Sequence, residues 1–101
     1  MNATQKLILK TIKDNQTYLS AHYHLKRIGI FGSYARGNYT ENSDIDILAE
    51  FEHPIGLKFI EFTEYLEQIL GKRIDVLTVA GLNTIRNAKI VQEIQETIIY
   101  D

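Results

Sequence analysis

Three aspartates in strand-like segments are the residues of this sequence whose spacing best suits chemistry. Asp44 and Asp46 lie two positions apart in an alternating apolar–acidic segment, and Asp75 interrupts a second apolar run. Residues i and i+2 of a strand point to the same face of a sheet, with Cα atoms about 6.5–7 Å apart. Adjacent carboxylates repel each other unless a cation or a base lies between them. Because Mg²⁺ prefers carboxylate and phosphate oxygens, the three acids are candidates for a metal site in phosphoryl or nucleotidyl transfer.

A glycine-containing turn that precedes these acids could bind phosphate. The segment 32–37, GSYARG, follows an apolar strand-like run and suits a turn into a short helix. The free N–H groups of such a turn and the Ser33 hydroxyl would face phosphate oxygens. The two glycines have the spacing of a Walker A loop, but Asn38 and Tyr39 replace its Lys and Ser/Thr, which excludes that motif. The turn alone is weak evidence, because turns of this composition are common.

Each acid taken singly also has a simpler interpretation. Asp44 and Asp46 could lie on a solvated strand face, and Asp75 could pair with an arginine. The three acids together with the Gly-Ser turn favour a catalytic site over these interpretations.

Hydrophobic periodicity predicts the elements that must position these residues. Apolar residues at helical spacing predict three long helices, over residues 4–22, 57–70 and from 83 or 84 to 99. Thr4 is the expected N-cap of the first helix. Strands are predicted over residues 25–31, 44–51 and 73–79, with a short helix at 34–36. This order predicts an α/β fold in which a small mixed sheet of about three strands is packed by helices.

Length and composition limit the classes of protein that fit. With 101 residues, 45% hydrophobic and 24% charged, residues 1–101 are expected to form a single globular domain. The 11 basic and 13 acidic residues are nearly balanced, which disfavours nucleic acid as a direct partner. The absence of cysteine excludes disulfides, zinc–thiolate sites and cysteine catalysis. We expect a cytoplasmic protein with no membrane partner, because no signal peptide or long apolar run is visible.

Together the motifs resemble the signature of a known enzyme family. The segment 32–37, a five-residue gap and then Ser43-Asp44-Ile45-Asp46 are similar to the motif of the DNA polymerase β superfamily of nucleotidyltransferases. The likeness is greatest to its minimal nucleotidyltransferase (MNT) group. Asp75 falls where that family has its third acid.

The resemblance implies an enzyme that uses Mg²⁺ and ATP to transfer a nucleotidyl group to an acceptor hydroxyl. Asp44, Asp46 and Asp75 would then bind the metal, in a two-metal site, and Asp75 would also help to deprotonate the acceptor. The implied nucleotide-binding residues are Gly32, Ser33, Arg36 and Ser43. For Arg36, bracing the acids or forming a structural salt bridge stays open as an alternative.

The sequence also resembles the antitoxins of HEPN/MNT toxin–antitoxin pairs. In that family the nucleotidyltransferase adds AMP to a tyrosine of the HEPN ribonuclease toxin. The resemblance therefore implies an antitoxin that acts as a protein adenylyltransferase on a HEPN toxin partner. Two alternatives stay open: a binding-only antitoxin that neutralises the toxin by complex formation, and a small-molecule nucleotidyltransferase of the aminoglycoside-modifying type. Three carboxylates at one site argue against the binding-only alternative.

Overall fold

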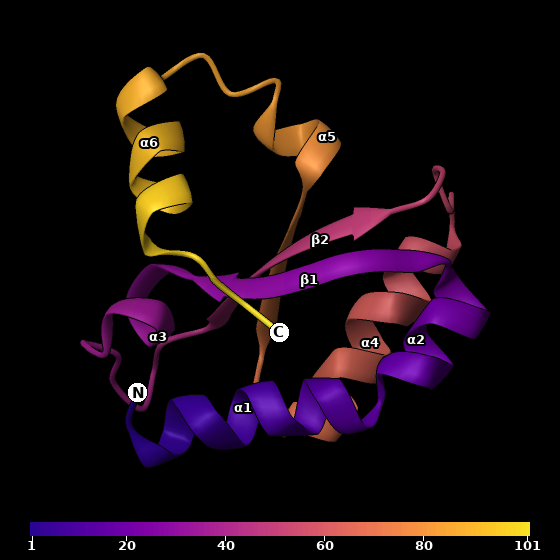
Figure 1. Ribbon diagram of the computed structural model, residues 1–101, viewed down its shortest axis with the longest axis horizontal. Coiled ribbons are helices and arrows are strands. Elements are labelled where there is room, and N and C mark those ends of the chain that lie inside the picture. The colour runs from indigo at the N-terminus through magenta and orange to yellow at the C-terminus, as the bar shows by residue number, and fades with distance from the viewer.

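Two apolar strands at the centre of the sheet hold the fold together. In the computed structural model, which describes residues 1–101, β1 (Leu25–Phe31) pairs antiparallel with β2 (Ile45–Phe51) (Figure 1). β3 (Ile74–Thr78) lies parallel to β2, and β4 (Ile99–Tyr100) lies antiparallel to β1, which gives the order β3-β2-β1-β4. The isoleucines of β1 and β2 are buried, because β-branched side chains pack well on a pleated sheet.

The main core lies on one face of this sheet. α1 (Ala3–Asp14), α2 (Gln16–Tyr23) and α4 (Lys58–Leu70) pack there, below and to the right of the central strands in Figure 1. Their buried side chains form one cluster with alternate residues of the strands, among them Ile45 and Ile47. Because strand side chains alternate between faces, the residues on either side of these isoleucines point to the opposite face.

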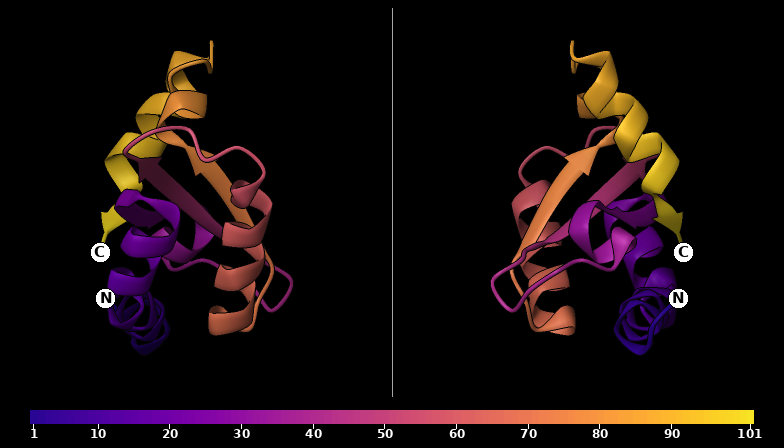
Figure 2. Two further views of the ribbon diagram at one scale, coloured as in Figure 1. Left: turned by 90° about the vertical axis from the view of Figure 1, so that its right-hand side faces the viewer. Right: turned by 90° about the vertical axis from the view of Figure 1, so that its left-hand side faces the viewer.

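The opposite face is covered in part by α5 (Val79–Leu82) and α6 (Ala88–Thr97). Leu82 and Ile94 of these helices are buried with Leu48 of β2 in a small second cluster. Both views of Figure 2 show α5 and α6 at the upper end of the molecule, away from α1. No helix of the chain combines the length and the apolar content that crossing a membrane requires.

A short helix, α3 (Gly32–Arg36), continues directly from the end of β1. Its Tyr34 is buried in the main core. Gln5 of α1 donates hydrogen bonds from Nε2 to the carbonyls of Tyr34 and Ala35, at 2.8 and 3.0 Å. Gln5 is itself buried, so these bonds satisfy a polar group whose burial would otherwise be costly. They fix α3 against α1.

The α/β fold is confirmed, but the predicted helix over residues 4–22 is two helices. α1 begins after an N-cap at Asn2 rather than at Thr4, because Asn2 forms a capping box with the residue three positions on. The helix is interrupted at Asn15, whose side-chain oxygen accepts a hydrogen bond of 2.8 Å from the Tyr65 hydroxyl of α4. This contact with a distant helix is not visible in the local periodicity.

The prediction of one last helix to residue 99 was also wrong. α5 ends early, and α6 starts after Asn87, whose side chain accepts hydrogen bonds from the N–H groups of Lys89 and Ile90. The chain then forms β4, so the sheet has four strands rather than about three. Gly29 of β1 makes room for this strand, because a Cβ there would lie 2.8 Å from the Ile99 carbonyl oxygen.

Candidate active site

The predicted phosphate turn lies directly against one of the predicted acids. Gly32 opens α3 with a φ of +67°, in the left-handed region that favours glycine. A Cβ at this position would collide with the carboxylate of Asp46. The backbone conformation therefore favours glycine at residue 32, and a side chain there would have to displace the Asp46 carboxylate. Ser33, the next residue of the turn, is half-buried.

The strand register brings Asp46 and Asp75 side by side. The two residues are Cα partners in the parallel pairing of β2 and β3. On its other side, Asp46 is the partner of Phe31, the residue that precedes the Gly32 turn. Asp44 lies just before β2, which starts one residue later than predicted, and two positions from Asp46. The structure thus groups Asp46, Asp75 and the turn, with Asp44 next to them.

Asp46 is the acid of this group whose negative charge is most disfavoured by its surroundings. Burial raises the pKa of the Asp46 carboxyl above its usual range, and the nearby carboxylates of Asp75 and Asp44 raise it further. Arg36 acts in the opposite direction and lowers it. Asp46 is half-buried, whereas Asp44 and Asp75 are exposed, so the group is open to solvent on one side.

Sequence reasoning missed an ion pair at the edge of the group. Arg73 Nε lies 3.2 Å from Asp44 Oδ1, and both side chains are exposed. The pairing of β2 with β3 creates this contact, because Ile45 N–H donates to the Arg73 carbonyl at 3.0 Å. The only signal for it in the sequence is the position of Arg73 directly before the predicted third strand. An exposed pair of this kind contributes up to about 1 kcal/mol.

The other two predicted nucleotide-binding residues are held by neighbours. Arg36 Nη1 lies 3.2 Å from Glu93 Oε1 of α6, so the structural salt bridge that the sequence left open is present. The Ser43 hydroxyl accepts a hydrogen bond of 2.9 Å from the Thr40 N–H within the loop before β2. Ser43 therefore shapes the loop that leads to Asp44.

The residues of this group fit Mg²⁺ by their chemistry. No set of three histidine or acidic side chains is drawn together closely enough to form a metal site as it stands. The donors are carboxylate oxygens, the ligand type that Mg²⁺ takes together with substrate phosphates. Their mutual repulsion at Asp46 would be relieved by a cation. Asp44 would have to exchange its contact with Arg73 for such a cation.

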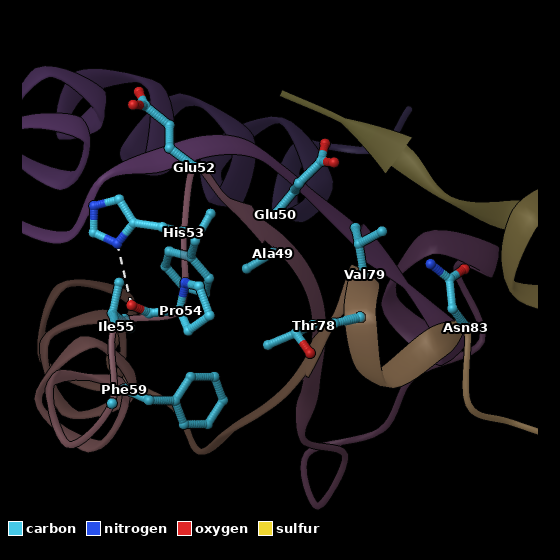
Figure 3. A pocket seen from close by; sticks show the side chains of 13 residues that line it. Ala49, Glu50, Glu52, His53, Pro54, Ile55, Phe59, Thr78, Val79 and Asn83 are labelled. Carbon is cyan, nitrogen blue, oxygen red and sulfur yellow. Dashed lines mark hydrogen bonds between the residues drawn. The ribbon is translucent and has the colours of Figure 1, made fainter.

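A separate pocket of about 490 Å³ lies at the far end of the same strands. Figure 3 shows it between the end of β2, the loop after β2 and the start of α5, with Ala49, Phe59 and Thr78 on its walls. None of the predicted site residues lines it. The acids therefore lie outside this pocket, with Asp46 roughly 10–16 Å from it along β2.

Comparison with known proteins assigns the family. Residues 8–101 match the family model described as a nucleotidyltransferase domain. The chain is a nucleotidyltransferase. It is 41% identical over 86 residues to the protein adenylyltransferase MntA of Thermococcus cleftensis, an alignment that covers 77% of this chain and 87% of MntA. It is also 45% identical over 100 residues to a Methanocaldococcus jannaschii protein provisionally named a protein adenylyltransferase, covering 91% of this chain and 99% of that protein.

Solved structures confirm the fold of this nucleotidyltransferase. A protein provisionally described as a minimal nucleotidyltransferase superposes with a TM-score of 0.66 at 27% identity, over 90% of this chain and 93% of that chain. A chain from a toxin–antitoxin crystal structure with AMP-PNP superposes with a TM-score of 0.63 at 24% identity, over 95% of this chain and 70% of that chain. The second likeness concerns the fold alone. The resemblance to the minimal nucleotidyltransferases is thus confirmed.

Substituting Gly32 should destabilise the protein more than substituting a glycine that has the same kind of backbone conformation but free space around it. We expect Gly32→Ala to lower the free energy of unfolding by about 1–2 kcal/mol for the left-handed φ, plus about 1–3 kcal/mol for the collision with Asp46. Gly56→Ala is the matched control, because Gly56 also has a positive φ, +59°, but has open space around its Cβ position. Urea unfolding of both variants measures the difference. Equal losses would contradict the close packing of Gly32 against Asp46.

The raised pKa of Asp46 predicts that removing its carboxyl group stabilises the protein at neutral pH. The folded protein favours the protonated carboxyl of Asp46. Its contribution to the free energy of unfolding is fully present below the unfolded-state pKa of about 3.9. It is lost as the pH rises through the higher pKa of the folded state. Asp46→Asn should therefore be more stable than the wild type at neutral pH, and the difference should shrink in acid. Urea unfolding at neutral and at acidic pH tests this. Glu64→Gln is the control, because Glu64 is exposed and its substitution should change the free energy of unfolding little.

Proposed function

We propose that this nucleotidyltransferase is the antitoxin of a HEPN/MNT-type toxin–antitoxin pair and transfers AMP from ATP to a tyrosine hydroxyl of its HEPN toxin. The observation that carries the proposal is the placement of Asp46 between Asp75 and the Gly32 turn. This placement joins carboxylates suited to a metal with a turn suited to phosphate. The protein adenylyltransferase name of the relative MntA supports AMP as the transferred group.

The proposed reaction forms one bond and breaks one bond at phosphorus. The acceptor hydroxyl oxygen bonds to the α-phosphorus of ATP, while the bond from that phosphorus to the bridging oxygen of the β-phosphate breaks and pyrophosphate leaves. The hydroxyl proton passes to the Asp75 carboxylate, which is exposed on the edge strand β3 and so accessible to an acceptor. The open surface around Asp44 and Asp75 suits an acceptor carried by another protein.

The same proposal assigns the remaining residues. Gly32 and Ser33 hold the triphosphate, and Arg36 and Ser43 complete the nucleotide site. Asp44, Asp46 and Asp75 would hold Mg²⁺, which when bound offsets the charge of the phosphates. The carboxylate of Asp46 is already placed against the turn, so metal and triphosphate would bind next to each other.

Intact-mass spectrometry of the toxin tests this function. The protein encoded beside this chain, the candidate toxin, is incubated with the wild-type protein, ATP and Mg²⁺. We expect a mass gain of one or more AMP units, and its loss with Asp44→Asn or Asp46→Asn, because each variant removes a charged metal ligand. Tyrosine should be the modified residue in a peptide digest.

Three other outcomes would contradict the proposal in different ways. An unchanged toxin mass with a tight complex would indicate a binding-only antitoxin. Transfer to a soluble acceptor without any protein partner would indicate a small-molecule nucleotidyltransferase. Full transfer by both aspartate variants would remove the assigned acids from the site.

A further inference from the structure

Arg36 has two anionic neighbours and contacts only one of them. Its Nη1 lies 3.2 Å from Glu93 Oε1. The carboxylate of Asp46 packs against Gly32, which belongs to the same short helix as Arg36, yet the ion pair of Arg36 is with Glu93. The guanidinium is thus placed beside the acids without occupying them.

The Arg36–Glu93 pair borders the phosphate turn. Arg36, Glu93 and Gly32 line one hollow of about 200 Å³ between α3 and α6, whose apolar wall includes Phe31 and Ile94. The same Gly32 packs against Asp46. The guanidinium therefore borders the turn to which the proposed function assigns the triphosphate.

We propose that Glu93 is a positioning residue that holds the Arg36 guanidinium at the phosphate turn and keeps it off the Asp46 carboxylate. The inference rests on the proposed function, because it takes a nucleoside triphosphate as the ligand. An arginine can bind a carboxylate through two parallel hydrogen bonds, and such a pair with Asp46 would block a metal ligand. Glu93 offers Arg36 a competing carboxylate on the other side of the hollow.

The helix that carries Glu93 is anchored to the sheet through its C-terminal half, so this part of the helix can act as a fixed support. Asn87 caps its start, and Ile94 is buried with Leu48 of β2. After its end, Ile99 and Tyr100 pair with β1. A group on a rigid element holds its partner more accurately than one on a loop.

The pair also leaves donors for a ligand. A guanidinium carries five N–H donors, and the contact with Glu93 is made through Nη1. The other donors stay available for phosphate oxygens, which arginine binds well. Arg36 can thus bind a triphosphate without releasing Glu93.

Binding of a non-hydrolysable ATP analogue with Mg²⁺, measured by isothermal titration calorimetry, tests the role of Glu93. We expect Glu93→Gln to bind the analogue about fivefold more weakly, the scale of one exposed ion pair. Glu93→Asp, which keeps the charge, should recover part of the loss. Glu96→Gln is the matched control, because Glu96 lies on the same helix but accepts a hydrogen bond from Gln92. Its affinity should equal that of the wild type.

A double variant shows whether Glu93 acts through Arg36. In an Arg36→Ala background, Glu93→Gln should cause no further loss of affinity. Wild-type affinity in the single Glu93→Gln variant, or the same loss in both backgrounds, would overturn the positioning role while leaving the proposed function intact. Failure of the wild-type protein itself to bind the analogue would instead contradict the proposed function, and the inference with it.

Discussion

The negative charge of the half-buried Asp46 carboxylate, next to two other carboxylates, is the constraint on which this site depends. The strand register places Asp46 beside Asp75, and the strand period places Asp44 on the same face. Burial makes the largest contribution to the raised pKa of Asp46 and the repulsion adds to it, so the charged form of Asp46 is disfavoured in the folded protein. A chain that keeps such an arrangement gives up stability, and a bound cation is the direct way to recover it.

The rest of the fold holds this arrangement in place. The isoleucine-rich pair β1 and β2 fixes the register, and the main core secures these strands from the opposite face. Gln5 donates hydrogen bonds to two backbone carbonyls of α3, which helps to hold the Gly32 turn next to Asp46. On the site's own face, α6 is anchored through Ile94 and through β4, and it brings Glu93 to Arg36. The charged residues are therefore positioned by apolar packing together with the hydrogen bonds of Gln5.

Local patterns in the sequence predicted the fold class and which acids of a strand share a face, but they did not predict contacts between residues far apart in the sequence. The period of two put Asp44 and Asp46 on one face, and the run around Asp75 marked a strand, so the acids could be found from residues alone. The break at Asn15 depends on Tyr65, and β4 depends on the space at Gly29. The ion pairs of Asp44 with Arg73 and of Arg36 with Glu93 depend on how the strands and α6 pack, which the sequence pattern does not show.

Thermal unfolding with and without Mg²⁺ tests the central claim most directly, with sodium chloride at matched ionic strength as the reference. If a cation relieves the repulsion at Asp46, Mg²⁺ should raise the melting temperature of the wild-type protein above that in sodium chloride. Asp46→Asn should gain clearly less from Mg²⁺, because one of the repelling charges is gone. No effect of Mg²⁺ on the wild type, or an equal rise in the variant, would contradict the account.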